Sequence, residues 1–281
     1  MPTAASPRTE SADQNHNQSI ASFLGLDNNV NEVPSDPGVA HWDELAPRFD
    51  DEVFDSVGGS SNRRTLIEIK RAAVRRGSIA DFGCGTGRHM ALLSSLFDTV
   101  VGIEQSPACI AIARQRCAAL PNVSLQVGRR SPRTMRGAFD VVLCANVAIH
   151  PAQAQWQRVL ASAADLLRSG GRLVLVVPSA ESAKLVADRD PSHERDPLKV
   201  QEEWTQGVFD VGGVPTKHFA KSELREALQN IGLRVMRILP NEYSWSSYGL
   251  SAPRMSKGIR PWDWVAVATS PTTIEEAATS N

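Results

Sequence analysis

The sequence predicts an α/β domain built around a doubly wound sheet, and three observations predict it. Short apolar runs alternate with helical runs from Ser78 onward, which is the pattern of successive βαβ units. A loop with glycine at alternate positions, residues 83–87, follows the first apolar run. Polar side chains, Glu104 and Asn146, end two later runs, at the edge of a doubly wound sheet where ligands bind.

The chain of 281 residues, 42% of them hydrophobic, can form one large α/β domain or two small ones, and we expect one domain over residues 39–270. Residues 1–38 are rich in Ser, Asn, Asp and Pro and contain few large apolar side chains. Residues 271–281 are similar in composition. Such segments cannot bury enough apolar surface to offset the entropy of ordering, so we expect a disordered tail at each end.

Two stretches before the first strand have apolar residues at helical spacing. The first covers residues 42–54 and contains Trp42 and Phe49, and the second covers residues 62–76. Both are expected to form helices, which would make up an N-terminal helical cap of the domain.

Seven short apolar runs are the strand candidates: Ile79–Phe82, Thr99–Glu104, Ser124–Gly128, Asp140–Asn146, Arg172–Pro178, Leu233–Leu239 and Trp264–Thr269. The helices expected among them are Gly87–Leu96, Pro107–Ala119, Pro151–Arg168 and Ser222–Ile231. Ser106 is the expected N-cap of the second of these helices. Gly170 and Gly171 are the expected C-cap of the third, and Gly232 ends the fourth.

Residues 179–220 interrupt the alternation of strands and helices. This segment carries Pro, Asp and Glu with weak periodicity, so we expect an insertion that lies over the edge of the sheet. Long connections at such a position commonly act as lids over a substrate.

The glycine loop predicts a ligand that touches the backbone. Gly83, Gly85 and Gly87 place three residues without side chains where the first strand turns into a helix. Backbone N–H groups at such a helix start attract anionic groups such as a carboxylate. Glu104 ends the second strand, where a carboxylate can accept hydrogen bonds from both hydroxyls of a ribose. With Asn146, these positions are expected to converge on one crevice.

The motif around the loop narrows the choice of ligand. The dinucleotide fingerprint G-x-G-x-x-G needs a third glycine where this chain has Arg88, which disfavours NAD. The pattern Asp81-Phe82-Gly83-Cys84-Gly85-Thr86-Gly87 closely resembles the first motif of class I S-adenosylmethionine-dependent methyltransferases. The resemblance continues through Val101–Ser106, Phe139–Asn146 and Leu167–Leu173, and covers about residues 42–269. It implies a seven-stranded, mostly parallel sheet whose last strand is antiparallel.

The resemblance also implies a set of cofactor-binding residues. The glycine loop would hold the methionine part of S-adenosylmethionine, Asp81 and Asn146 would lie near its amino group, and Glu104 would hold the ribose. The full set is Asp81, Gly83, Cys84, Gly85, Gly87, Glu104, Gln105 and Asn146. The family commonly places an acidic residue against the adenine amine after the third strand, whereas residues 127–131 offer two arginines. Adenine contacts must therefore use the backbone or another residue.

His150 is the candidate catalytic residue. It follows the fourth strand, beside the expected position of the methyl group, and an imidazole can act as a base near neutral pH. It is similar to a histidine that many small-molecule methyltransferases carry there. A structural histidine that hydrogen-bonds at the start of the next helix explains the position as well.

Candidate substrate residues lie in two later segments. Tyr243 and Trp245 belong to a polar and aromatic run between the last two strands, and aromatic faces stabilise cations such as a sulfonium. His218 lies at the end of the insertion, just before the sixth helix, and could also reach the site. Trp42 is a further aromatic candidate, although core packing explains it equally well.

Composition restricts the partners and the compartment. With 30 basic and 31 acidic residues, the net charge of −1 provides no overall field for nucleic acid or an acidic membrane. The four cysteines lack the spacing of a disulfide framework or a zinc site, so we expect no metal and a reducing compartment. No apolar run approaches the roughly 20 residues of a membrane span. These features favour a cytoplasmic protein.

The sequence therefore predicts S-adenosylmethionine-dependent methyl transfer to a small molecule by in-line displacement, in which holding the acceptor in line supplies most of the acceleration. One alternative is a protein or RNA methyltransferase, and the near-neutral charge counts against RNA. The other is a non-catalytic methyltransferase-like binding protein, against which the intact glycine loop and Glu104 argue. The sequence does not indicate an oligomeric state.

Overall fold

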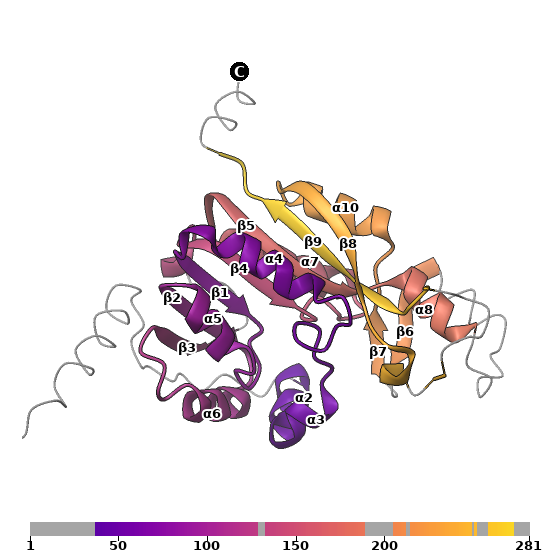
Figure 1. Ribbon diagram of the computed structural model, residues 1–281, viewed down its shortest axis with the longest axis horizontal. Coiled ribbons are helices and arrows are strands. Elements are labelled where there is room, and N and C mark those ends of the chain that lie inside the picture. The colour runs from indigo at the N-terminus through magenta and orange to yellow at the C-terminus, as the bar shows by residue number, and fades with distance from the viewer. Residues whose placement is uncertain are drawn as a thin grey trace, which may run out of the picture.

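A computed structural model describes residues 37–128, 133–188, 205–211, 214–248, 250–251 and 258–272. Within these residues one twisted sheet runs through the molecule with helices on both sides (Figure 1). The predicted tails, residues 1–38 and 271–281, lie almost entirely outside the described residues. None of the helices in the described part of the chain is long and apolar enough to cross a membrane.

The central sheet has seven strands in the order β3-β2-β1-β4-β5-β9-β8. Strand β9 pairs antiparallel with both β5 and β8, and the pairs from β3 to β5 are parallel. The strands are β1 Ser78–Phe82, β2 Thr99–Glu104, β3 Val123–Val127, β4 Phe139–Ala145, β5 Leu167–Pro178, β8 Arg234–Glu242 and β9 Trp262–Thr269. The predicted seven-stranded, mostly parallel sheet is thus confirmed.

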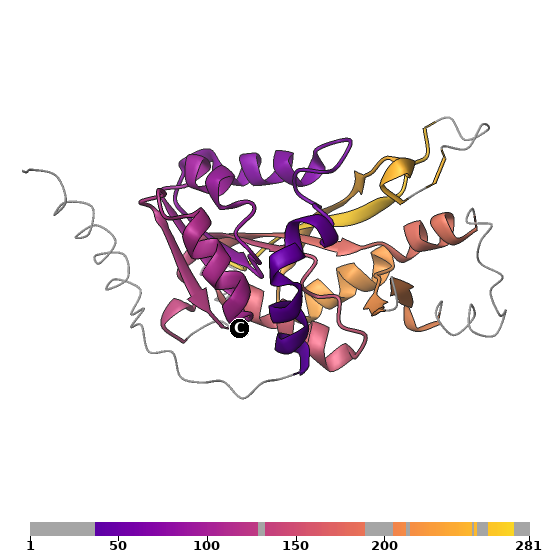
Figure 2. The same ribbon diagram turned by 90° about the horizontal axis from the view of Figure 1, so that it is seen from below.

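Each face of the sheet packs against its own helices, which gives the doubly wound architecture. Helices α4 (Arg64–Ala72), α5 (Met90–Leu96) and α6 (Pro107–Arg116) contribute to one apolar cluster, and α7 (Gln153–Asp165) and α10 (Lys221–Asn230) contribute to the other. Figure 2 shows α4 and α5 on one side of the sheet and α7 and α10 on the other. Because both faces are covered, the central strands are almost continuously apolar.

The predicted N-terminal helix over residues 42–54 is broken into three pieces. They are α2 (Pro37–Leu45), the single 3-10 turn η1 (Ala46–Arg48) and α3 (Phe49–Glu52). Pro47 lies in the middle piece, and a proline has no N–H to continue an α-helical hydrogen-bond ladder. The break lets the chain bend over the ends of the strands, and α2 and η1 pack against α6. Figure 1 shows α2 and α3 together below the strand ends.

The prediction that Gly170 and Gly171 cap a helix is wrong. Helix α7 ends at Asp165, and both glycines lie inside β5. The β4–β5 register shifts between Phe139 and Val141, and Gly170 takes a φ of 70° there. A β-bulge that needs positive φ favours glycine for the same conformational reason as a helix C-cap does, so sequence alone could not separate the two.

The insertion contains regular structure that its weak periodicity did not predict. Helix α8 (Ala180–Ala187) begins at Ser179, whose side chain accepts a hydrogen bond from the Ser182 N–H. Strands β6 (Val208–Val211) and β7 (Val214–Lys217) form a separate antiparallel hairpin. Two short 3-10 turns, η3 (Arg133–Met135) and η4 (Trp245–Tyr248), lie elsewhere in the connections, and η2 (Ala73–Arg75) extends α4.

The two ends of the insertion are joined to each other. The Phe219 N–H donates to the carbonyl of Pro178 at 2.8 Å, and the Ala180 N–H donates to the carbonyl of Phe219 at 3.0 Å. The insertion therefore leaves the sheet and returns at the same point, beside the carboxyl end of β5.

Candidate active site

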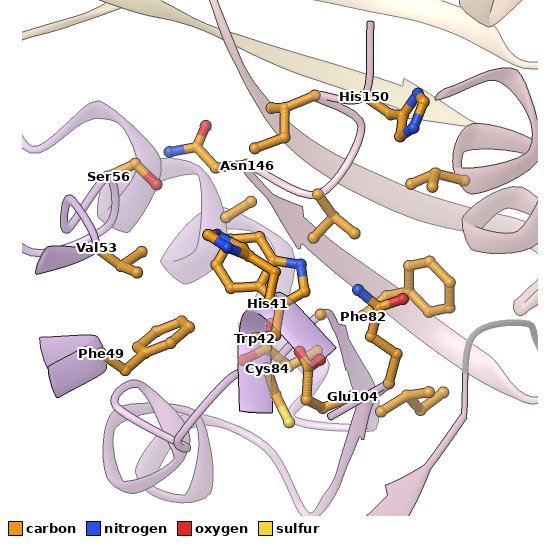
Figure 3. A pocket seen from close by; sticks show the side chains of 18 of the residues that line it. His41, Trp42, Phe49, Val53, Ser56, Phe82, Cys84, Glu104, Asn146 and His150 are labelled. Atoms are coloured by element: carbon orange, nitrogen blue, oxygen red, sulfur yellow. The ribbon is translucent and has the colours of Figure 1, made fainter. Parts of the chain in front are cut away.

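A cavity of about 790 Å³ opens at the carboxyl ends of β1, β2 and β4. Side chains from residues 41–56 of the N-terminal cap, which run from within α2 to just past α3, form one wall of the cavity. The connection from β4 to α7 forms another (Figure 3). The lining includes six of the eight predicted cofactor residues: Asp81, Gly83, Cys84, Glu104, Gln105 and Asn146. His150 lines it too.

Gly83 shows why the loop after β1 needs glycine. Its φ is 86°, and a Cβ added there would lie 2.2 Å from Cγ2 of Val147. Its N–H donates to the carbonyl of Ile103 in β2 at 2.7 Å, which fixes the turn between the two strands. Only a residue without a side chain fits between the loop and the end of β4.

Gly85 and Gly87 do not line the cavity. A Cβ on Gly85 would lie 2.5 Å from the ring of Phe49, and a Cβ on Gly87 would lie 3.1 Å from Ala113 of α6. Both residues have positive φ. They let the cap and α6 pack tightly against the loop, so their part in a cofactor site is to shape it.

Glu104 is held by backbone donors on both sides of its carboxylate. Oε2 accepts from the Gly85 N–H at 3.1 Å, and Oε1 accepts from the Ser106 N–H at 3.0 Å. Burial raises the pKa of this carboxyl, and these N–H donors oppose that effect. A carboxylate has about four acceptor positions, so capacity remains for the hydroxyls of a ribose.

Asp81 and Asn146 line the cavity, and each carries a buried acceptor atom without a partner among the described residues. Neither Asp81 Oδ2 nor Asn146 Oδ1 has a hydrogen bond to any described residue. Burial raises the pKa of Asp81 to about 6. Asn146 also has a φ of 57°, a left-handed conformation that costs energy for a residue with a side chain. Two unpaired acceptors at the ends of the paired strands β1 and β4 fit a donor with several N–H groups, such as an α-ammonium.

The N-terminal cap is fastened to this site by two aspartates. Asp43 accepts from the Ser106 hydroxyl at 2.5 Å and from the Ala108 N–H at 3.1 Å, at the start of α6. Asp50 accepts from Thr86 at 3.0 Å and pairs with Arg116 at 2.6 Å. These contacts hold the cap over the glycine loop.

The cap supplies lining residues that the sequence analysis did not assign to the cofactor. His41, Trp42 and Phe49 point into the cavity (Figure 3). The rings of Trp42 and Phe49 are 6.1 Å apart between centroids. No local pattern distinguishes them from core residues of an amphipathic helix, because the surface they contact is formed by segments distant in sequence.

His150 is exposed at the cavity and already makes one hydrogen bond through its ring. Nδ1 accepts from the Ala152 N–H at 2.9 Å, and Ala152 is the N-cap of α7. In the neutral ring this places the proton on Nε2. His150 therefore lines the cavity and also makes a structural hydrogen bond at the start of α7.

The three predicted substrate residues do not line the cavity. Tyr243 is fully buried and donates to Asp263 Oδ2 at 2.8 Å, and Trp245 donates to the carbonyl of Ile259 at 3.1 Å. His218 packs on the ring of Phe209, and burial lowers its pKa to about 4. Their positions do not support contact with a substrate.

Neighbours of those residues reach the cavity in their place. Thr216, two residues before His218, lines it, as does Phe54, whose ring packs edge-on against Tyr243 at 4.6 Å. Helix α7 adds Gln155, Arg158 and Ser162. These three polar residues are three and four positions apart in the sequence, which places them on one face of a helix. The sequence therefore contained a signal for this polar face.

Comparison with known protein families agrees with this geometry. Residues 79–171 match the family model described as a methyltransferase domain. That segment runs from β1 into β5 and includes the glycine loop, Glu104, Asn146 and His150.

Curated relatives include methyltransferases with acceptors of different kinds. A dTDP-3-amino-3,6-dideoxy-alpha-D-glucopyranose N,N-dimethyltransferase of Streptomyces fradiae is 34% identical over 76 residues, which are 27% of this chain and 29% of that protein. A tRNA (carboxymethyluridine(34)-5-O)-methyltransferase of Macaca fascicularis is 30% identical over 171 residues, 56% of this chain and 24% of that protein. The matched regions are thus less than a third of each relative's length.

Solved structures share the fold. The 1,6-didemethyltoxoflavin-N1-methyltransferase of Burkholderia thailandensis, determined with 1,6-didemethyltoxoflavin and S-adenosylhomocysteine, has a TM-score of 0.55 and 17% identity, over 88% of this chain and 97% of that chain. The [4+2]-cyclase SpnF has a TM-score of 0.53 and 14% identity, over 84% and 95% of the two chains. A cyclase among the neighbours shows that the fold alone does not fix the reaction.

The fold and the site define a doubly wound α/β domain with a cavity at the carboxyl ends of its strands, lined by a buried carboxylate, Glu104, and by two buried acceptors, those of Asp81 and Asn146. With the match of residues 79–171 to the methyltransferase domain, and a fold shared with S-adenosylmethionine-dependent methyltransferases of known structure, the chain is similar to the class I S-adenosylmethionine-dependent methyltransferases.

Proposed function

We propose that this chain transfers the methyl group of S-adenosylmethionine to a small-molecule acceptor. The observation that carries the proposal is the pair of unpaired acceptors, Asp81 Oδ2 and Asn146 Oδ1, in the same cavity as Glu104. They lie at the ends of β1 and β4, and Glu104 lies at the end of β2 on the other side of β1, an arrangement that suits a ligand with an ammonium group at one end and a ribose further along. The cavity continues past them to His150 and Thr216, which leaves room for an acceptor.

The chain's own residues contribute mainly by holding the reactants. Bound S-adenosylmethionine supplies an electrophilic methyl group. Glu104 binds the ribose hydroxyls, and Asp81 with Asn146 orients the ammonium, so the methyl group has a fixed direction. The cap covers the site and limits access of water. Positioning of this kind can account for much of the acceleration of an in-line displacement.

His150 is the candidate for contact with the acceptor. Because its Nδ1 is engaged by Ala152, the neutral ring presents an N–H to the cavity. This favours a hydrogen bond that orients the acceptor. Removal of a proton from the acceptor requires the ring to release Ala152 first.

A small-molecule acceptor is favoured by the named activities of two similar proteins, the Streptomyces dimethyltransferase and the Burkholderia N1-methyltransferase. The similarity to a tRNA methyltransferase supports an RNA acceptor as the second candidate. The near-neutral net charge of −1 counts against it, because RNA affinity depends on positive charge.

The test is transfer of label from methyl-labelled S-adenosylmethionine to a metabolite extract, to total tRNA and to a protein extract in parallel. Label in the metabolite fraction alone is expected. Label in tRNA or protein would contradict the small-molecule proposal, and the absence of transfer from a protein that binds the cofactor would favour a non-catalytic role.

Glu104→Ala is the matched control for that assay. It removes the predicted ribose contact, so the affinity for S-adenosylhomocysteine in calorimetry should fall about tenfold or more, since hydrogen bonds to a charged group contribute about 1.5–3 kcal/mol. An unchanged dissociation constant would refute the ribose assignment.

A further inference from the structure

The acceptor end of the cavity is lined by one face of α7 and by the turn before that helix. His150 lies in the turn, and Gln155, Arg158 and Ser162 follow on the helix. The contacts assigned above to the cofactor use none of the three helix residues. This face of α7 is therefore available to the methyl acceptor.

Arg158 is a guanidinium in the cavity lining without an acidic partner among the described residues. Its Nη1 donates to Gln155 Oε1 at 3.2 Å, and this is its only hydrogen bond to a described residue. An arginine side chain has five N–H donors in a planar fork that matches the two oxygens of a carboxylate or phosphate. Arg158 is exposed, so the donors that remain can reach a ligand.

The other arginine of the described lining, Arg88, is occupied by the cap. Its Nε pairs with Asp50 at 3.2 Å, and its two terminal nitrogens donate to the carbonyls of Val53 and Phe49 at 3.0 and 3.2 Å. Arg88 therefore fastens the cap. Arg158 is the arginine of the described lining that remains for a ligand.

The neighbours of Arg158 also present donors. Because the side-chain oxygen of Gln155 accepts from Arg158, its NH2 group is left as a donor for a ligand. His150 accepts from the Ala152 N–H at Nδ1, so the neutral ring carries its proton on Nε2. A guanidinium, an amide and an imidazole N–H on one wall fit a group that accepts several hydrogen bonds.

The described lining is divided by charge. Its two carboxylates, Asp81 and Glu104, lie at the ends of β1 and β2, and none of its acidic side chains lies on α7 or in the turn before that helix. Figure 3 shows Glu104 and His150 on opposite sides of the cavity. One end of the cavity thus presents hydrogen-bond acceptors, and the other end presents donors with a positive charge, which suits an anion.

We propose that the methyl acceptor carries a carboxylate or phosphate group and that Arg158 binds this group through two N–H donors. Gln155 and His150 donate to the same molecule beside it. This assignment rests on the proposed function in that a small molecule accepts the methyl group. It adds that the molecule is an acid.

The test uses a metabolite extract that is freed of macromolecules by ultrafiltration and divided on an anion exchanger at pH 7. The retained and the unretained fractions are each incubated with the full-length protein and methyl-labelled S-adenosylmethionine. Label is expected in the retained fraction. Treating that fraction beforehand with phosphodiesterase and phosphatase separates the two sources of charge, because a phosphate acceptor then loses its label and a carboxylate acceptor keeps it.

Arg158→Ala should lower the rate of label transfer to the dilute retained fraction about tenfold or more, as loss of a charged hydrogen bond predicts. The loss should shrink in concentrated extract, because binding of the acceptor is what the variant weakens. Its affinity for S-adenosylhomocysteine in calorimetry should stay within about twofold, which also shows that the variant is folded.

Two further variants complete the test. Arg158→Lys keeps the charge without the planar fork, so it should restore part of the rate. Arg225→Ala removes an exposed arginine of α10 that is not among the described lining residues, and it should change neither measurement.

Three results would overturn the assignment. Label in the unretained fraction alone would mean that the acceptor has no acidic group, while methyl transfer to a small molecule would stand. Equal rates for wild type and Arg158→Ala with the dilute retained fraction would mean that another group binds the acid. Absence of label from both fractions, with a protein that binds S-adenosylhomocysteine, would overturn the proposed function and this assignment with it.

Discussion

Asp81 and Asn146 show, at the scale of single residues, how a binding site differs from a core. Each holds a buried acceptor atom without a partner in the described structure, and such an atom costs about 1–3 kcal/mol in a folded protein. Asn146 adds a left-handed backbone conformation. A ligand with N–H groups would donate hydrogen bonds to both unpaired acceptors. The energetic cost of leaving these acceptors unsatisfied therefore favours binding of such a ligand.

Protonation of Asp81 should make cofactor binding pH-dependent. Its pKa is raised to about 6 by burial, and an ammonium binds the ionised form. Below that pH, protonation competes with the ligand, so the affinity for S-adenosylhomocysteine should fall by up to about tenfold between pH 6 and pH 5. Calorimetry from pH 5 to pH 8 measures this.

Asp81→Asn is the control for that prediction. All other groups are the same in both proteins, so the difference between the two pH profiles isolates Asp81. The variant should bind more weakly at pH 7.5 and lose this part of the pH dependence. Parallel profiles would show that Asp81 does not contact the ammonium.

The same raised pKa predicts that Asp81 destabilises the protein in the absence of ligand. A carboxyl with a raised pKa binds a proton in the folded state at pH values where the unfolded chain has lost it, so the free energy of unfolding falls as pH rises from about 4 to 6. A shift from 3.8 to about 6 corresponds to about 3 kcal/mol.

Asp81→Asn should therefore raise the free energy of unfolding of the ligand-free protein at pH 7.5, by up to about 3 kcal/mol. Urea unfolding of both proteins at pH 7.5 and pH 4 measures it. The gain should be much smaller at pH 4. A variant that is less stable than wild type at both pH values would contradict the prediction.

The elements around the site are joined through the start of α6. Ser106 accepts from the Cys109 N–H at 3.0 Å, as its predicted N-cap role requires, and donates to Asp43 of the cap. One hydroxyl therefore stabilises a helix and fastens α2 to the domain.

Ser106→Ala should remove both contacts. Loss of a helix N-cap costs about 0.5–2 kcal/mol, and the hydrogen bond to Asp43 is lost with it, so the free energy of unfolding should fall by about 1–2 kcal/mol. Urea unfolding followed by circular dichroism measures the change. Ser106→Thr, which can keep the cap hydrogen bond, should lose less, and equal losses would point to packing as the cause.

Element positions were predicted well where they depend on local pattern. The seven strands were each located, and most of their ends agree within one or two residues, because a buried parallel strand is a short apolar run bounded by turn residues. The cap helix was wrong in detail because Pro47 breaks it, and α8 and the β6–β7 hairpin were missed because the insertion packs through contacts that leave little periodicity.

At the scale of the whole molecule, the strand order predicts the direction in which the cofactor would lie. Asp81 and Asn146 lie at the ends of β1 and β4, and Glu104 lies at the end of β2, one strand further along. In the proposed site the methionine end would therefore face β1 and β4, and the base would face β3, where Gly128 lines the cavity. Residues 129–132, where the sequence lacks the acidic residue typical of the family, lie outside the described part of the chain.

Cofactor binding should stabilise the fold as a unit, because the cavity is lined by the ends of β1, β2 and β4, by the cap and by α7. At a concentration 100 times its dissociation constant, S-adenosylhomocysteine should add about 2.7 kcal/mol to the free energy of unfolding. For a domain of this size that corresponds to a rise in Tm of about 5–10 °C, measured by thermal unfolding. Glu104→Ala at the same ligand concentration should show a smaller rise, and a wild-type Tm that does not move would contradict the site.

The sequence by itself determined the sheet, the glycine loop and the polar residues at the strand ends, because each depends on residues that are contiguous in the chain. Asp81, Glu104 and Asn146 could be assigned to one crevice, since parallel strands bring their carboxyl ends to the same edge. Only the tertiary structure decided which distant side chains complete the cavity. The tertiary structure brings Trp42 and His89 to the lining of the cavity and buries Tyr243. These outcomes depend on contacts between separate segments of the chain, such as Tyr243 with Asp263 and His89 with Asp55, and no local pattern encodes such contacts.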